Sequence, residues 1–75
     1  MKGILEFNLP EDCCEHILAV HAMDFALLAW DLDQYLRDKL KYGHEFTNAD
    51  DALEATREFL REQLYNRQIS LDMIV

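Results

Sequence analysis

The sequence predicts a mainly α-helical fold: a long helix and a shorter antiparallel helix forming a helical hairpin, a short N-terminal β-strand, and an oligomeric state. Three observations support this prediction. Residues 12–42 contain neither Gly nor Pro, and their apolar side chains recur at the spacing of an amphipathic helix. A second helical pattern follows the loop after Gly43. The 75 residues, 51% hydrophobic and 29% charged, have the composition of a single folded domain, residues 1–75.

Residues 3–9, GILEFNL, are expected to form a short β-strand. Their side chains alternate between two faces, one of which carries Leu5, Phe7 and Leu9. A single strand leaves its backbone hydrogen-bonding groups unpaired, so it needs a neighbour. That neighbour is either the C-terminal tail, residues 69–75, or the same strand in a second subunit, and we favour the second subunit.

Residues 11–42 are expected to form one continuous helix. Pro10 suits its first turn, and Gly43 suits the left-handed conformation that ends a helix. Lys39 and Lys41 lie in the last turns, where cations interact favourably with the helix dipole. The residues expected on the inner face share one arc of the helix: Cys14, Ile17, Leu18, His21, Ala22, Phe25, Leu28, Ala29, Leu32, Tyr35, Leu36 and Leu40.

A second apolar stripe runs along the opposite face of this helix and consists of Val20, Met23, Leu27 and Trp30. A helix that is apolar almost all round is buried on both sides. The stripe is therefore either a part of the chain's own core, covered by the N-terminal segment, or a subunit interface. We favour the interface because a helix of this length spans about 46 Å. A compact domain of 75 residues has a radius of gyration of only about 11 Å.

Residues 48–65 are expected to form the second helix. Thr47 or Asn48 caps its start, and acidic residues populate its first turn. The short loop before it predicts that it folds back antiparallel on the first helix. The tail, residues 69–75, is apolar, and its start is expected to be ordered either as a strand or as a short turn capped by Ser70.

The net charge of −8 is unevenly distributed along the chain. Between Gly3 and Leu36 there are seven acidic residues and no Lys or Arg. The candidate acidic surface consists of Glu11, Asp12, Glu15, Asp24 and Asp31. Direct binding to nucleic acid or to an anionic membrane needs a positive surface, so both are disfavoured. A protein partner with a basic surface is compatible with this distribution.

The location expected for the chain is the cytoplasm. The longest apolar run, FALLAW, is too short to span a bilayer. The first residues, MKGILEF, lack the pattern of a signal peptide. The two cysteines, Cys13 and Cys14, are adjacent and do not form a disulfide framework.

Metal-ligating residue types are present at unsuitable spacings. His16 and His21 are five residues apart, which places them on different sides of a helix, and His21 with Asp24 supplies only two ligands. Asp24, Asp31 and Asp38 recur every seven residues. Neighbours in that row are about 10 Å apart and too distant to share one ion. We therefore expect no metal, no cofactor and no catalytic residue.

Three segments resemble a group of small proteins that are encoded in bacteriophage genomes and have no assigned function. The segments are LEFNLPED, AVHAMD and WDLDQYLRDKLKYG. The resemblance covers most of the chain and is strongest at residues 30–43. It implies a phage origin, the host cytoplasm as location and a small helical fold, and it implies no catalytic residue.

The function expected from these features is that of a non-enzymatic, self-associating interaction protein. A second hypothesis is an acidic phage inhibitor, or a mimic of nucleic acid, that binds a host defence or nucleic-acid enzyme. A third hypothesis is a metal-dependent nucleotide hydrolase, which the spacing of the aspartates disfavours. The oligomeric state, salt-dependent capture of a host enzyme, and metal retention after dialysis distinguish the three.

Overall fold

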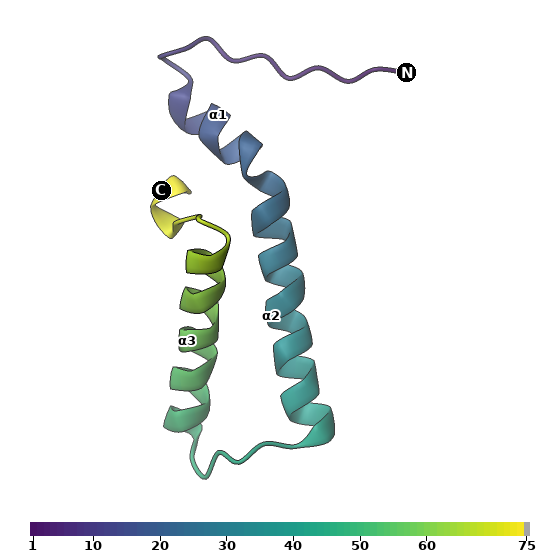
Figure 1. The fold of residues 1–75 in the computed structure, drawn as a ribbon, viewed down its shortest axis with the longest axis vertical. Coiled ribbons are helices and arrows are strands. Elements are labelled where there is room, and N and C mark those ends of the chain that lie inside the picture. The colour runs from purple at the N-terminus through teal and green to yellow at the C-terminus, as the bar shows by residue number, and fades with distance from the viewer. Residues whose placement is uncertain (75) are drawn as a thin grey trace.

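A computed structural model describes residues 1–74 of the chain. It contains α1 (Cys13–Val20), α2 (Ala22–Tyr42), α3 (Ala49–Asn66) and the short 3₁₀ helix η1 (Leu71–Met73). Helices α2 and α3 lie side by side and antiparallel, and η1 contacts α1 (Figure 1). The molecule is an elongated hairpin with extents of 51 × 30 × 17 Å. The predicted mainly helical class is confirmed.

Helices α2 and α3 pack through a narrow row of side chains. Tyr35 of α2 stacks on Phe59 of α3, with ring centroids 4.4 Å apart. Leu28 of α2 and Ile69, which follows α3, are the most deeply buried side chains of residues 1–74, at 8% and 6% exposure. Leu28 and Tyr35 both lie on the inner face that the apolar spacing predicts. The core of the hairpin is therefore a single row of side chains between α2 and α3.

The second helix starts and ends close to its predicted bounds. It was expected at residues 48–65, and α3 spans Ala49–Asn66. The side chain of Asn48 accepts a hydrogen bond from the backbone N–H of Asp51 at 2.9 Å. Asn48, rather than Thr47, is therefore the residue that caps the helix.

The end of α3 is a tight reversal of the chain. Gln68 adopts the left-handed backbone conformation, with φ of 55°. The N–H of Ile69 donates to the carbonyl of Leu64 at 3.0 Å, and the N–H of Gln68 donates to the carbonyl of Tyr65 at 3.1 Å. These two bonds form a Schellman motif, whose left-handed position is usually occupied by Gly. The reversal turns Ile69 back into the core.

The tail adopts the turn alternative. The Ser70 side chain accepts a hydrogen bond from the N–H of Asp72 at 3.2 Å and caps η1. The strand alternative for residues 69–75 is not formed in the described part of the tail, and Val75 lies outside the described residues. The tail packs against α1 and is not available to pair with the N-terminal segment.

The helix expected over residues 11–42 is divided in two. Its start is delayed to Cys13, because Asp12 donates its N–H to the carbonyl of Asn8 at 2.8 Å and closes a turn. It breaks at His21, where φ is −97° and ψ is 10°, and the axes of α1 and α2 differ by 51°. A straight helix of about 46 Å would extend past α3. The bend instead brings α1 into contact with η1.

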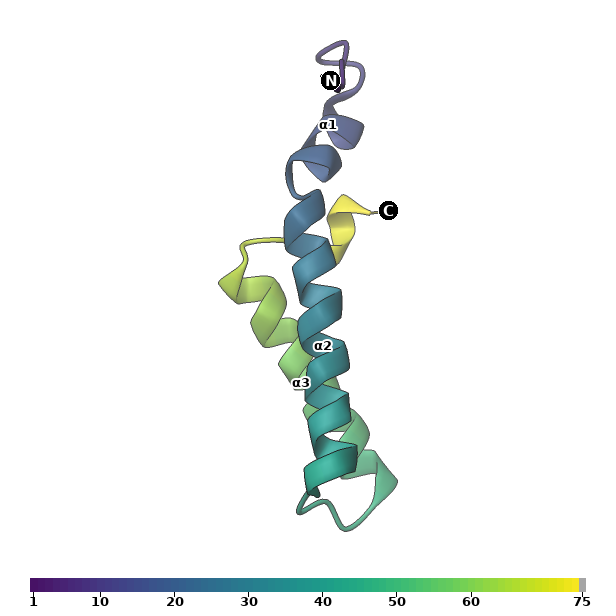
Figure 2. The same cartoon turned by 90° about the vertical axis from the view of Figure 1, so that its right-hand side faces the viewer.

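The strand expected at residues 3–9 is not formed within the described chain, because a strand needs a neighbour and the tail has folded as η1. Residues 1–9, here called the N-terminal arm, extend from α1 toward the side of α2 that faces away from α3 (Figures 1 and 2). Its apolar residues Ile4, Leu5 and Leu9 are 78%, 80% and 57% exposed. The arm is thus an apolar segment without cover.

The reversal after α3 gives a stability prediction. Gln68→Gly should raise the free energy of unfolding by about 0.5–1 kcal/mol, because Gly adopts positive φ without the steric cost that a side chain brings. Gln63→Gly, inside the same helix, should lower it by about 1 kcal/mol. Chemical denaturation at one fixed protein concentration measures both. A loss of stability in the Gln68 variant would contradict the left-handed assignment.

Candidate functional site

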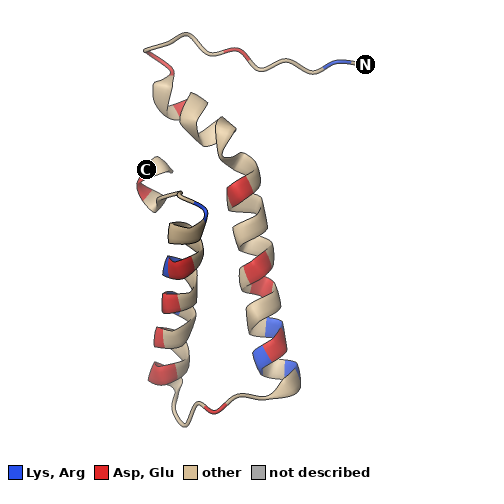
Figure 3. Cartoon of the chain, in the orientation of Figure 1, with Lys and Arg blue, Asp and Glu red and all other residues tan. Residues whose placement is uncertain are grey.

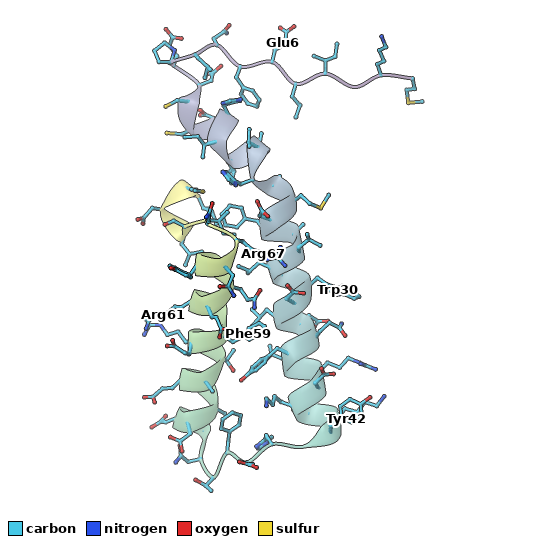
Figure 4. The ribbon with its side chains drawn as sticks, in the orientation of Figure 1. Glu6, Trp30, Tyr42, Phe59, Arg61 and Arg67 are labelled. Carbon is cyan, nitrogen blue, oxygen red and sulfur yellow. The ribbon has the colours of Figure 1, made fainter. Side chains whose placement is uncertain are left out.

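The second apolar stripe of α2 lies on the surface of the described chain. Val20, Met23, Leu27 and Trp30 are 63%, 68%, 42% and 62% exposed. Figure 4 shows Trp30 projecting from α2 on the side opposite Phe59 and α3. These four residues are here called the outer stripe. The chain's own α3 and N-terminal arm do not cover them, in contrast to the first of the two alternatives left open by the sequence.

Two of the five candidate acidic residues are engaged inside the chain. Arg67, which follows α3, places Nη2 at 2.6 Å from Asp31 Oδ2 and Nη1 at 3.9 Å from Asp24 Oδ1. His21 Nδ1 lies 3.3 Å from the other Asp24 oxygen. The Arg67 side chain is only 22% exposed, so its charge is partly removed from water. Asp24 and Asp31 therefore hold the end of α3 against α2, and are not free acidic surface.

The other three acidic residues gather at the start of α1. Glu11 and Glu15 are exposed, and Asp12 accepts a hydrogen bond from the Asn8 N–H at 2.9 Å. None of the three forms an ion pair with a described residue. This group is here called the acidic end.

Basic residues gather in the last turns of α2, at the end of that helix farthest from α1 (Figure 3). Lys39 lies over the Tyr35 and Phe46 rings, with Nζ 5.5 and 5.9 Å from their centroids. Arg37 and Lys41 are exposed. The Arg37 guanidinium lies 3.9 Å from Asp38, a weak surface contact. Arg37 and Lys41 are here called the basic end.

Two shallow hollows lie on the surface, one that includes Val20 of the outer stripe and one in the last turns of α2. The first lies between the N-terminal arm and α1 and is lined by Leu5, Phe7, Leu9, His16, Ala19 and Val20. The rings of Phe7 and His16 contact each other in a tilted arrangement, with centroids 5.3 Å apart. The second is lined by Asp33, Leu36, Arg37, Leu40 and Lys41. Both are open surfaces lined mainly by apolar carbon.

Metal-ligating side chains do not converge in residues 1–74, where no group of three or more His, Cys, Asp or Glu residues is placed to hold an ion. Cys13 and Cys14 are free and exposed. Their sulfurs are 3.9 Å apart, and the hydrogen bond between them, together with neighbouring negative charge, raises the pKa of the Cys14 thiol. A raised pKa keeps the thiol protonated near neutral pH and makes it a poorer nucleophile.

No single helix of the described chain is both long and apolar enough to cross a membrane. Helices α1 and α2 together reach the required length and composition, but they meet at the 51° bend.

The role of Arg67 was not anticipated from the sequence. The signal was present in part, because Asp24 and Asp31 lie seven residues apart on one edge of the helix. Their partner is 36 residues beyond Asp31, and no local spacing connects the two. The first hollow was missed for a similar reason, because it depends on the path of the N-terminal arm.

The Arg67 contacts give a second stability prediction. Arg67→Met should lower the free energy of unfolding by about 1–2 kcal/mol, because it removes a charge-assisted hydrogen bond and leaves Asp24 and Asp31 without their cationic partner. Arg61→Met, at an exposed position on α3, should change the free energy of unfolding by less than about 0.5 kcal/mol. Asp31→Asn should cost less in the Arg67→Met background than alone. Equal losses in the two arginine variants would refute the role given to Arg67.

The outer stripe is thus exposed in residues 1–74, with the acidic end beyond its start and the basic end beyond its last residue. The resemblance to phage-encoded proteins stays an expectation. No protein-family model, curated protein or solved structure matches the chain.

Proposed function

We propose that the protein is a non-enzymatic interaction protein that assembles with a second copy of itself through the outer stripe. The exposed surface carries this proposal. The chain exposes 6482 Å². A compact monomer of 8.9 kDa exposes about 4,800 Å². The single chain therefore leaves an excess of about 1,700 Å² in water.

The shape of the chain has the same implication. Its radius of gyration is 16.6 Å, whereas a compact domain of this length has about 11 Å. Small chains that cannot bury enough apolar surface alone commonly gain stability by oligomerising. A second copy of the chain is the simplest partner for the outer stripe, because it is present wherever the chain is present.

The excess area is the right size for a dimer. Obligate homodimers bury about 2,000–5,000 Å² in total, or about 1,000–2,500 Å² on each subunit. The excess on this chain falls within that range. The outer stripe also has suitable residues, since Trp and Met are enriched at protein interfaces. Burial of Trp30 and Met23 on assembly would remove two of the largest exposed apolar side chains of α2.

Several side chains of types that occur in catalytic sites have structural partners within the chain, which supports an interaction role. Arg67 binds Asp31 and Asp24, and His21 contacts Asp24. His16 packs on Phe7. The His44 ring accepts a hydrogen bond from the Phe46 N–H at 3.2 Å. Each contact stabilises a local turn or a helix pair.

The proposal predicts a protein that is oligomeric at micromolar concentration. Leu27→Asp should shift it to the monomer, because a buried unpaired carboxylate at the interface is strongly unfavourable. Leu53→Asp is the matched control: Leu53 is also an exposed leucine, at 67%, but lies on α3 outside the stripe. It should leave the mass unchanged. Light scattering or sedimentation across a dilution series measures the mass.

Trp30 is the single tryptophan of the chain and gives a second readout. Its emission should shift to the red on dilution, as the indole becomes exposed to water, and the Leu27→Asp variant should show the red-shifted emission at every concentration. A monomeric wild-type mass throughout the micromolar range would rule out the proposed assembly.

A further inference from the structure

The outer stripe belongs to a longer row that starts at the last residue of α1 and continues along α2. The spacing of three and four residues continues beyond Trp30, so that the row consists of Val20, Met23, Leu27, Trp30, Gln34, Arg37 and Lys41. Such a row lies along one seam of a helix that pairs with another helix. It is apolar in its first half and ends in the two residues of the basic end. The seam therefore has a direction.

The acidic end gives the opposite charge at the other end of the seam. Two copies aligned in parallel would place acidic end beside acidic end and basic end beside basic end. Two copies aligned antiparallel would place each basic end beside the acidic end of the other copy. Like charges in contact disfavour an arrangement and opposite charges favour it, so charge selects the antiparallel alignment.

The apolar half of the seam fixes the register of an antiparallel pair. Val20 lies opposite Trp30 of the second copy when the apolar halves match, and Met23 then lies opposite Leu27. Residues 37–41 of one copy then extend beyond the bend at His21 of the other copy, where the axis of α1 departs from that of α2 by 51°. The acidic end and the root of the N-terminal arm lie beyond the same bend.

The first hollow, between the N-terminal arm and α1, offers an apolar surface for the end of a second α2. Leu36 and Leu40 were expected on the inner face, but they are 40% and 84% exposed, and both line the second hollow. The arm extends toward the outer side of α2, where Trp30 also points (Figure 4). The end of a second α2 that follows the antiparallel register arrives beneath this arm.

We infer, on the basis of the proposed self-association, that two copies pair antiparallel along the α2 seam, each arm covering Leu36 and Leu40 of the other copy. In this pair Arg37 and Lys41 face the acidic end of the partner. The two arms lie at opposite ends of the dimer. Each arm therefore packs on a helix of the second copy and does not pair with the other arm, unlike the strand pairing favoured by the sequence.

Charge reversal tests the alignment of the ends. In a low-salt buffer, Arg37→Glu with Lys41→Glu should raise the dimer Kd at least about tenfold, because acidic groups then face the acidic end. The difference should shrink in 1 M salt, where charges are screened over about 3 Å. Arg57→Glu with Arg61→Glu, exposed on α3, is the matched control and should leave Kd unchanged. An unchanged Kd in the Arg37 and Lys41 variant overturns the inference, because a parallel pair exchanges one like-charge contact for another.

Crosslinking tests the register and the arm directly. Cys13→Ser with Cys14→Ser provides a background without thiols. Leu9→Cys and Leu40→Cys are then made in separate copies, at residues 57% and 84% exposed, and a short bismaleimide is added to each alone and to their mixture. The antiparallel pair should crosslink only in the mixture. Two Leu40 positions in that pair are about 45 Å apart along the seam.

The remaining outcomes are distinct from one another. A crosslink in the Leu40→Cys protein alone shows a parallel pair and overturns the inference while leaving self-association intact. A dimeric mass without a crosslink in the mixture overturns the placement of the arm, again with self-association intact. A monomeric mass of the thiol-free background, measured by light scattering, removes the proposed function and the inference with it.

Discussion

Two helices packed side by side can hide only one face of each, and this limit governs the whole molecule. Helix α2 has 21 residues and α3 has 18. Where they pack together, Leu28 is buried and Tyr35 stacks on Phe59. No third layer covers the other face of α2 in the described chain. The outer stripe is exposed for this reason, and so is the excess surface that the second copy is proposed to bury.

The ends of the chain are arranged around the same limit. After α3 the chain reverses at Gln68. This reversal directs Ile69 into the core between α2 and α3 and places η1 against α1. Arg67 lies at this reversal and binds Asp31 and Asp24 on α2. The bend at His21 brings α1 to the tail. Each of these contacts adds cover on the inner side, and together they leave the arm and the outer stripe on the other side.

The uneven charge of the chain acquires a structural meaning in this arrangement. Part of the acidic excess is internal, because Asp24 and Asp31 neutralise Arg67. Another part, Glu11, Asp12 and Glu15, forms the acidic end, and the basic end lies at the far end of α2. A chain that is acidic at one end of its proposed interface and basic at the other is complementary to its own reversed copy. The same charges would otherwise be solubilising surface, or a surface for a basic partner.

The sequence by itself determined the features that depend on neighbouring residues. The spacing of three and four identified the helices, the inner face with Leu28 and Tyr35, and the outer stripe with Trp30, and a cap residue before α3 was recognisable from its type. Only the tertiary structure decided the break at His21, the path of the arm and the partner of Asp31. The physical reason is range: Arg67 is 36 residues from Asp31, and the bend and the arm depend on where the tail packs, so no local pattern encodes them.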